Sequence, residues 1–345
     1  MRAITRVGTG QPARLIRLMG MVSFAFLAVG IFLWAFGKNP VRAYGEIFQG
    51  ALGSTYGLTE LLVKMTPFIL CASATALPAR IGLINVGAEG QLHTGALIAT
   101  WGALTFGDLP RGILLPFLVI LGFAGGAIWG SFSGALRTMV GLNETISTLL
   151  LNYVAVLLVE HYVHGPWKDP ASFNWPFTAE FTEAARLPTF GSSRVHFGLV
   201  FALTAVVVLY LVLRKTRWGY EMRVIGDNAE AARRAGIPIG RYIVLTMFIG
   251  GGLAGLAGMA EVSAIQGRLR PGISTGFGYT GFLVSWLASH HPIGIVIMAF
   301  LLGVLALGGD MIQINLGLPY STVNIIMALI FFIVLGSGQL KKMGA

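Results

Sequence analysis

The sequence predicts an all-α protein that crosses a membrane about ten times. Of its 345 residues, 55% are hydrophobic and only 11% are charged, whereas a soluble domain usually carries about 25% charged residues. The mean hydropathy of +0.76 points the same way. The 47 glycines fall inside apolar runs, where glycine lets helix backbones approach closely. Lipid is therefore the expected solvent, and residues 1–345 are expected to form a single transmembrane domain.

Each expected helix is a run of mostly apolar residues, because about 20 such residues are needed to cross the hydrocarbon layer. The eighth and ninth runs are short and are joined by Ser289-His290-His291-Pro292. They could be half-helices, and we expect His290 and His291 to mark a tight cytoplasmic turn. In order, the runs lie at residues 15–36, 58–78, 86–106, 113–136, 146–163, 195–213, 242–265, 278–289, 293–307 and 322–335.

The positions of Lys and Arg predict which ends of the spans face the cytoplasm. With the N-terminus inside, fifteen of these residues fall in internal segments and eight in external ones. Because positive charge concentrates in cytoplasmic loops, we expect both termini in the cytoplasm. The longest external segment is 164–194, and the longest and most charged internal segment is 214–241. This topology explains the net charge of +10, so nucleic acid is not an expected partner.

The stretch from Ile84 to His93 is unusually polar for the edge of a span. Polar groups in a bilayer are costly unless they face protein or a water-filled path, and broken helices often line substrate sites. Gly87 and Gly90 loosen the helix here. The stretch therefore either lines a transport path or simply places Glu89 at the cytoplasmic interface. The candidate path residues are Asn85, Glu89, Gln91 and His93.

Glycine recurs at every fourth position within the run at 113–136. This spacing puts small residues on one face of a helix and lets a neighbouring helix pack at short range. The four glycines expected to form this helix-packing face are Gly122, Gly126, Gly130 and Gly134. A second glycine-rich stretch, residues 250–255, has the spacing of a dinucleotide-binding fingerprint. No strand precedes it, so we interpret it as another packing face.

Several ionisable residues lie near the ends of the expected spans, and we expect them to have a structural role and not a functional one. Glu60 and Lys64 are four residues apart and are expected to neutralise each other, with a path-lining role as the alternative. Glu160, His161 and His164 could suggest a metal site. Polar residues are common at membrane interfaces, so no metal site is predicted.

Within the internal segment, residues 226–238 have the pattern of a short capped helix. Asp227 can cap its start, with Glu230 three residues later as in a capping box, and Gly236 with Pro238 ends it. This pattern favours a rigid knob presented to a partner, although a solvated loop is the alternative. The residues expected to carry this contact are Gly226, Asp227, Asn228, Glu230, Ala232, Arg233, Arg234 and Gly236.

Sequence motifs of catalysis are missing from the chain. It has no GxxxxGK(S/T) phosphate loop, so it is not expected to hydrolyse ATP by itself. It also has no HExxH, no GxSxG and no spaced Cys/His cluster. Cys71 is the single cysteine, which rules out a disulfide within the chain. We therefore expect neither an enzyme site nor a bound cofactor.

Six segments carry motifs that are specific when taken together. They are residues 82–91 (GLINVGAEGQ), 142–148 (LNETIST), 151–153 (LNY), 216–221 (TRWGYE), 223–228 (RVIGDN) and 231–236 (AARRAG). With them, nearly the whole chain resembles the ABC importer permeases of the branched-chain amino acid and ribose type. The most similar branch is that of the simple-sugar and nucleoside permeases, which work with basic-membrane-protein-type binding lipoproteins. One departure is the sequence at 289–292, where a Gly-Arg-containing turn is expected before the proline.

This resemblance implies a permease subunit without an ATPase site in a bacterial cytoplasmic (inner) membrane. Its partners would be a second homologous permease in a heterodimer, a cytoplasmic ABC ATPase that binds ATP and Mg, and an external substrate-binding lipoprotein. The 226–236 segment would be the coupling helix that docks on the ATPase, and the solute a nucleoside or simple sugar. The alternative is an ion-coupled secondary transporter, which needs ionisable groups deep in the bundle. Only Glu89, Lys64 and Glu160 come near that requirement.

Overall fold

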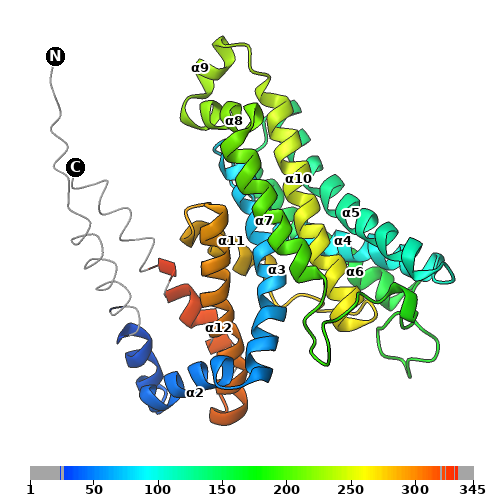
Figure 1. Cartoon of the computed structure of the whole chain (residues 1–345), viewed down its shortest axis with the longest axis vertical. Helices are drawn as coiled ribbons and strands as arrows, with labels where there is room; N and C mark the ends of the chain where they lie inside the picture. The colour runs from blue at the N-terminus through cyan, green and yellow to red at the C-terminus, as the bar shows by residue number, and fades with distance from the viewer. Residues whose placement is uncertain (1–23, 25–26, 319–320, 323, 330, 333–345) are drawn as a thin grey trace. The chain divides into compact units, whose positions relative to one another are not determined.

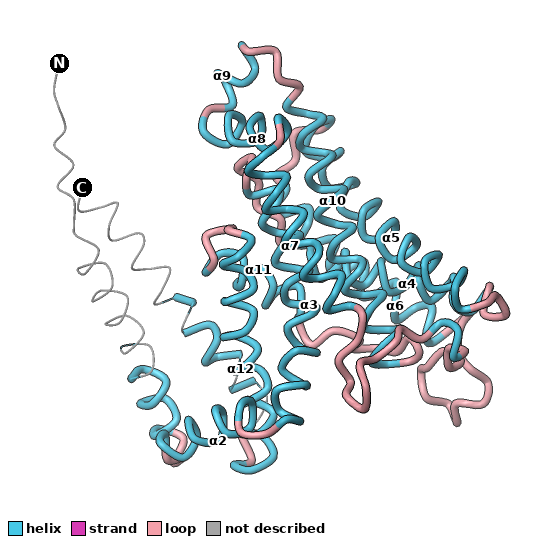
Figure 2. The backbone as a smooth tube through the Cα atoms, in the orientation of Figure 1, coloured by secondary structure: helices cyan, strands magenta, loops and turns pink. Residues whose placement is uncertain are grey.

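The computed structural model describes residues 24, 27–318, 321–322, 324–329 and 331–332, and this part of the chain is helical (Figures 1 and 2). The one β-bridge within it joins Thr189 and His196. The helical class predicted from the sequence is therefore confirmed. The chain divides into two compact units, Thr55–Gly303 and a smaller unit of Met1–Ser54 with Val304–Ala345.

The helices are labelled in chain order from α2, and the described residues also form two short non-α turns. A 3₁₀ turn, η1, lies in the long connection after α6, and a π-helical turn, η2, continues α10. The bounds are α2 Pro40–Leu52, α3 Thr55–Ala79, α4 Ala88–Thr105, α5 Arg111–Met139, α6 Glu144–His164, η1 Glu183–Ala185, α7 Gly198–Lys215, α8 Arg217–Asp227, α9 Ala229–Arg234, α10 Ile239–Ala260, η2 Glu261–Gln266, α11 Phe277–Leu287 and α12 Pro292–Leu316.

Six helices in the described part of the chain are long and apolar enough to cross a membrane. They are α3, α5, α6, α7, α10 with η2, and α12, and each overlaps a run predicted from the sequence. By contrast, α11 has only eleven residues, so the eighth run is short enough for a half-helix, whereas the ninth run is not a half-helix because it belongs to the 25-residue α12. The runs at 15–36 and 322–335 extend beyond the described residues, and both termini lie outside them. The structure thus describes a multi-pass helical membrane protein.

Polar side chains at the helix starts explain several of the observed boundaries. The Oδ1 atom of Asn143 accepts hydrogen bonds from Thr145 N at 2.9 Å and Ile146 N at 3.3 Å, so α6 begins at the next residue. Thr216 accepts from Gly219 N at 3.2 Å and caps α8 in the same way. Such caps satisfy the first backbone N–H groups, which have no partner within their own helix.

The larger unit is organised around α10, which packs against α3, α4 and α5. The four glycines of α5 face α10. At Gly126, a Cβ atom would stand 2.7 Å from the Cα atom of Gly255, and at Gly122 it would stand 2.5 Å from the Cβ atom of Met259. Only glycine therefore permits this separation of the two backbones. The glycine-rich stretch of α10 forms the other side of this interface, as the sequence suggested.

The smaller unit contains a helix that the sequence did not predict, because α2 falls between the first two predicted runs, at 15–36 and 58–78. Helix α2 turns Ala43, Ile47 and Ala51 inwards. The second half of α12 lies against it, with Gly308 beside Ile47 and Met311 beside Gly50. Lys38 Nζ donates to the carbonyl oxygen of Leu316 at 2.6 Å, which ties the connection before α2 to the end of α12.

Candidate functional site

The polar stretch found in the sequence forms the non-helical connection between α3 and α4 together with the first turns of α4. Gly82 has a φ of +80°, which allows the chain to turn out of α3. Helix α4 begins only at Ala88. The backbone from Ile84 to Gly87 is therefore outside any helix, and its N–H and C=O groups need partners other than lipid.

Asn85 and Gln91 bind each other within this connection. The Nδ2 atom of Asn85 donates to Gln91 Oε1 at 3.2 Å, and Gln91 Nε2 donates to Asn85 Oδ1, also at 3.2 Å. Asn85 also accepts from Gly87 N at 3.0 Å and donates to the carbonyl of Ala74 in α3 at 3.2 Å. Because both amides are buried, the pair fastens the start of α4 to α3.

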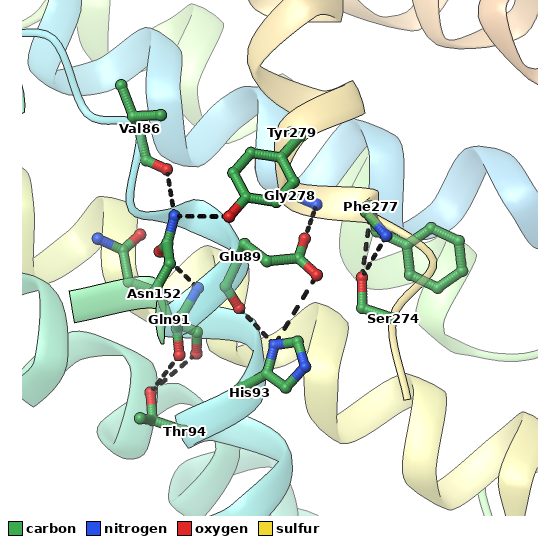
Figure 3. Close-up of polar contacts among 12 residues, drawn as sticks. Val86, Glu89, Gln91, His93, Thr94, Asn152, Ser274, Phe277, Gly278 and Tyr279 are labelled. Carbon is green, nitrogen blue, oxygen red and sulfur yellow. Dashed lines mark hydrogen bonds and ion pairs between the residues drawn. The ribbon is translucent and has the colours of Figure 1, made fainter. Parts of the chain in front are cut away.

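Helix α6 supplies further partners of the connection, among them Asn152 (Figure 3). Asn152 Oδ1 accepts from Gly90 N at 2.8 Å, and its Nδ2 donates to the carbonyl of Val86 at 2.9 Å. Thr148 Oγ1 accepts from Val86 N, and Glu144 Oε1 accepts from Ile84 N, both at 3.3 Å. Three side chains one helical turn apart therefore replace the hydrogen bonds that the broken helix lacks.

Glu89 lies in the first turn of α4, and its side chain reaches the start of α11 (Figure 3). Its Oε2 atom accepts from Gly278 N at 2.7 Å, so the carboxylate meets the positive end of the helix dipole. The side chain is only 5% exposed. His93 lies one turn further along α4, and its Nδ1 atom is 2.8 Å from the carbonyl oxygen of Glu89 and 3.9 Å from Oε1. Glu89 thus joins α4 to α11.

The four path candidates therefore come together in one buried polar cluster between α3, α4, α6 and α11. Each of them has a hydrogen-bond partner within the protein. Their role in lining a path stays a prediction. Sequence reasoning missed Thr148, Asn152 and Tyr279 as members of the cluster. Asn152 Nδ2 and the Tyr279 hydroxyl are 3.5 Å apart. The signal was present for two of these residues, since the motifs at 142–148 and 151–153 contain Thr148 and Asn152.

The 214–241 segment forms two helices, α8 and α9, at one end of the larger unit (Figure 1). The prediction that Asp227 caps the short helix is wrong, because α8 extends through Asp227 and uses it as its last residue. The cap of α9 is Asn228, whose Oδ1 atom accepts from Ala231 N at 3.0 Å. Glu230 does not complete a capping box. It pairs with Arg233 at 2.9 Å and Arg234 at 3.2 Å.

The end of α9 agrees with the sequence. Gly236 has a φ of +77°, and the backbone N–H of Ile237 reaches back to the carbonyl of Ala232 at 3.0 Å, as in a Schellman motif. Ala232 is fully buried, whereas Asn228, Glu230, Arg233 and Arg234 are exposed. The segment is therefore a defined helix with an exposed polar surface, and not a solvated loop.

Helix α8 is joined to the start of α10 by a polar contact. The hydroxyl of Tyr242 donates to Glu221, and Arg217 Nε lies 2.7 Å from the other carboxylate oxygen. These two donors hold the pKa of Glu221 below its usual value. Because the carboxylate stays charged, α8 remains attached to α10 at neutral pH.

The 164–194 segment packs on the connection that follows η2, at the opposite end of the larger unit from α8 and α9 (Figure 2). Thr178 N donates to the carbonyl of Leu269 at 3.1 Å, and Phe181 N donates to Gly267 at 2.8 Å. Arg194 Nη1 lies 2.9 Å from Glu60 Oε2. Glu60 therefore has a partner 134 residues away, and its expected pairing with Lys64 stays a prediction. No group of three His, Cys, Asp or Glu side chains suited to a metal occurs among the described residues.

The expected tight turn between α11 and α12 is confirmed. His290 N donates to Ser285 O at 2.8 Å, and Ser289 N donates to Trp286 O at 2.9 Å. The Nδ1 atom of His290 lies 2.9 Å from the hydroxyl oxygen of Ser285. Burial and the nearby charge of Arg80 lower the pKa of His290 to about 4. The imidazole is therefore neutral at physiological pH.

A bundle of apolar spans, a buried polar break and an exposed pair of helices at one end define a multi-pass membrane protein of the permease class. The chain belongs to the family described as the branched-chain amino acid transport system / permease component, which matches residues 57–335.

Three relatives match most of the chain. A glucose ABC transporter permease protein of Haloferax volcanii is 37% identical and covers 92% of this chain and 86% of its own length. A nucleoside ABC transporter permease protein of Lactococcus lactis is 32% identical, with 93% and 90% covered. A guanosine ABC transporter permease protein of Bacillus subtilis is also 32% identical, with 90% and 91% covered. The chain is thus an ABC transporter permease, and none of these findings supports the ion-coupled alternative.

Proposed function

We propose that this chain is the transmembrane subunit of an ABC importer that carries a nucleoside or a simple sugar. The observation that carries the proposal is the similarity to glucose, nucleoside and guanosine permeases along about nine tenths of the chain. The subunit supplies half of the path and hydrolyses no ATP itself. An ATPase partner binds ATP and Mg, a second permease completes the path, and an external lipoprotein delivers the solute.

The exposed α8–α9 pair supports the place of the ATPase contact. Helix α9 is capped and has an exposed polar face, and the contact between Tyr242 and Glu221 holds α8 to α10. The pair can therefore transmit force as a rigid unit. The candidate docking residues on α9 are Asn228, Glu230, Arg233 and Arg234, with Ala232 as the packing residue beneath them. In this arrangement, the ATPase binds the two states of the subunit with different affinities, and ATP binding thereby shifts the subunit from one state to the other.

The proposed topology has about ten spans and both termini in the cytoplasm of a bacterial cell. The opposite placement of α8–α9 and the 164–194 segment in the larger unit supports it. Reporter fusions after Lys342 and within 164–194 test it. A reporter that works only outside the cytoplasm should be inactive when it is fused after Lys342. Activity of that fusion would contradict this topology.

The direct test of function is reconstitution. The chain is co-expressed with its genomic neighbours that encode an ATPase, a second permease and a binding lipoprotein, and the complex is placed in vesicles. We expect ATP-dependent uptake of radiolabelled guanosine or glucose, and no ATP hydrolysis by the permease alone. ATP-independent uptake driven by an ion gradient would overturn the proposal.

A further inference from the structure

Arg80, just beyond the end of α3, contacts two elements that are far apart in the sequence. Its Nη2 atom donates to the carbonyl oxygen of His290 at 2.8 Å, in the turn between α11 and α12. Its own carbonyl lies against Gly226 near the end of α8, where a Cβ atom would stand 3.3 Å from the Arg80 carbonyl carbon and closer still to its oxygen. One residue therefore bridges α8 and the α11–α12 turn.

The backbones of Gly226 in α8 and Arg80 are in close contact. A side chain at Gly226 would collide with backbone, which cannot rotate away as a flexible side chain would. On the same helix, Met222 and Ile225 are buried and Arg223 lies near enough for its charge to act on Arg80. A displacement of α8 toward Arg80 must therefore displace the Arg80 backbone as well.

The turn that Arg80 holds is a strained one. Ser289 and His290 have φ values of +50° and +58°, in the left-handed region that residues with a side chain rarely adopt. Such backbone persists only where its surroundings hold it in place. The Arg80 guanidinium and the Ser285 hydroxyl supply that restraint. The Arg80 Nε atom is itself buried without a hydrogen-bond partner, so this contact is not fully satisfied.

The same connection also holds the other end of α11. Glu89, nine residues after Arg80, binds the N–H of Gly278 at the start of the helix. Between the two ends, Gly281 packs on Ala72 of α3, where a Cβ atom would stand 2.9 Å from a backbone nitrogen. Helix α11 is therefore fixed at its start by Glu89 and at its end by Arg80, and both residues flank one short connection.

We propose that Arg80 is a positioning residue that transmits displacement of the α8–α9 pair to α11, and through α11 to the polar cluster at Glu89. This inference rests on the proposed function, because the displacement of α8–α9 comes from the ATPase. The physical requirement is a rigid contact on each side of Arg80. Gly226 meets it on one side, and the charge-assisted hydrogen bond to His290 meets it on the other.

The experiment uses the reconstituted complex with all partners and measures both uptake and ATP hydrolysis for Arg80→Gln, Arg80→Lys and Gly226→Ala. Arg214→Gln and Gly240→Ala are the matched controls. Arg214 is exposed and, among the described residues, contacts only Tyr210 of its own helix. A Cβ at Gly240 meets Thr138 at an ordinary 3.7 Å. We expect uptake per ATP hydrolysed to fall about ten-fold in Arg80→Gln, which corresponds to losing roughly one hydrogen bond to a charged group.

Gly226→Ala should show the same loss with the ATPase still bound, and Arg80→Lys should recover part of it because the charge is retained. Both control variants should keep the wild-type ratio. If Arg80→Gln does not assemble, Gly226→Ala decides the question alone. A wild-type ratio of uptake to hydrolysis in Gly226→Ala, or in an assembled Arg80→Gln complex, overturns the inference. Failure of the wild-type complex to take up solute with ATP would instead overturn the proposed function.

Discussion

Replacing Gly126 with alanine should destabilise the contact between α5 and α10. The added methyl carbon would stand 2.7 Å from the Cα and N atoms of Gly255, and still closer to the carbonyl oxygen of Gly251, whereas ordinary contact begins at 3.4 Å. All of these opposing atoms belong to the backbone. The two helices would have to separate by roughly 1 Å, and overpacking of this kind costs about 1–3 kcal/mol.

The measurement is the melting temperature of the purified protein in detergent, followed by intrinsic fluorescence. A loss of this size should lower it by about 2–10 °C for a unit of this length. Gly112→Ala is the matched control, because Gly112 lies in the same helix and a Cβ there meets nothing within 4 Å. Gly134→Ala should fall between them, since its nearest neighbour would be 3.2 Å away. Equal melting temperatures for Gly126→Ala and Gly112→Ala would refute the packing argument.

Three further predictions follow from the caps and the buried ionisable groups. Asn228→Ala should destabilise α9 by about 1 kcal/mol and speed hydrogen exchange there, whereas Asp227→Ala should not; the reverse order would restore Asp227 as the cap. Glu89→Ala should lower the melting temperature more than Glu89→Gln, which keeps an acceptor for the buried N–H of Gly278; equal values would contradict this. Burial and Arg194 lower the pKa of His196 to about 4, so its contribution to stability is complete above about pH 6.5 and is lost as the pH falls towards 4. His196→Asn should therefore lose less stability than the wild type between about pH 7.5 and about pH 5, and an unchanged difference between the two melts would disprove it.

Hydropathy was sufficient to locate the long helices, because the need to match the bilayer determines both their length and composition. It was insufficient for α2, whose polar residues Arg42 and Glu46 alternate with apolar ones and interrupt the run. The cap of α9 was assigned one residue too early for a different reason. Asp227 and Asn228 can both cap a helix, and the choice depends on where α8 ends, which the local pattern does not reveal.

Long-range pairs were beyond any local pattern. Glu60 was matched to Lys64 because four residues separate them, whereas the structure brings Arg194 to it from the 164–194 segment. Arg80 likewise has partners that are distant in the sequence, and the sequence used it only as one of the positive residues that predict orientation. Its contacts with Gly226 and His290 depend on how the α3–α4 connection, α8 and the α11–α12 turn meet. Sequence spacing carries no information about such a meeting point.

The two polar motifs of the chain explain each other once they are placed in space. A break between α3 and α4 leaves backbone groups of Ile84, Val86 and Gly90 that lipid cannot satisfy. Helix α6 meets that need with Glu144, Thr148 and Asn152, which stand one turn apart on one face. A bilayer therefore makes the two motifs interdependent, because the polar side chains of one are tolerated only where the other breaks the helix. A polar residue inside a span is in this case first a partner for broken backbone, and any contact with solute must be made by the same groups without leaving that backbone unsatisfied.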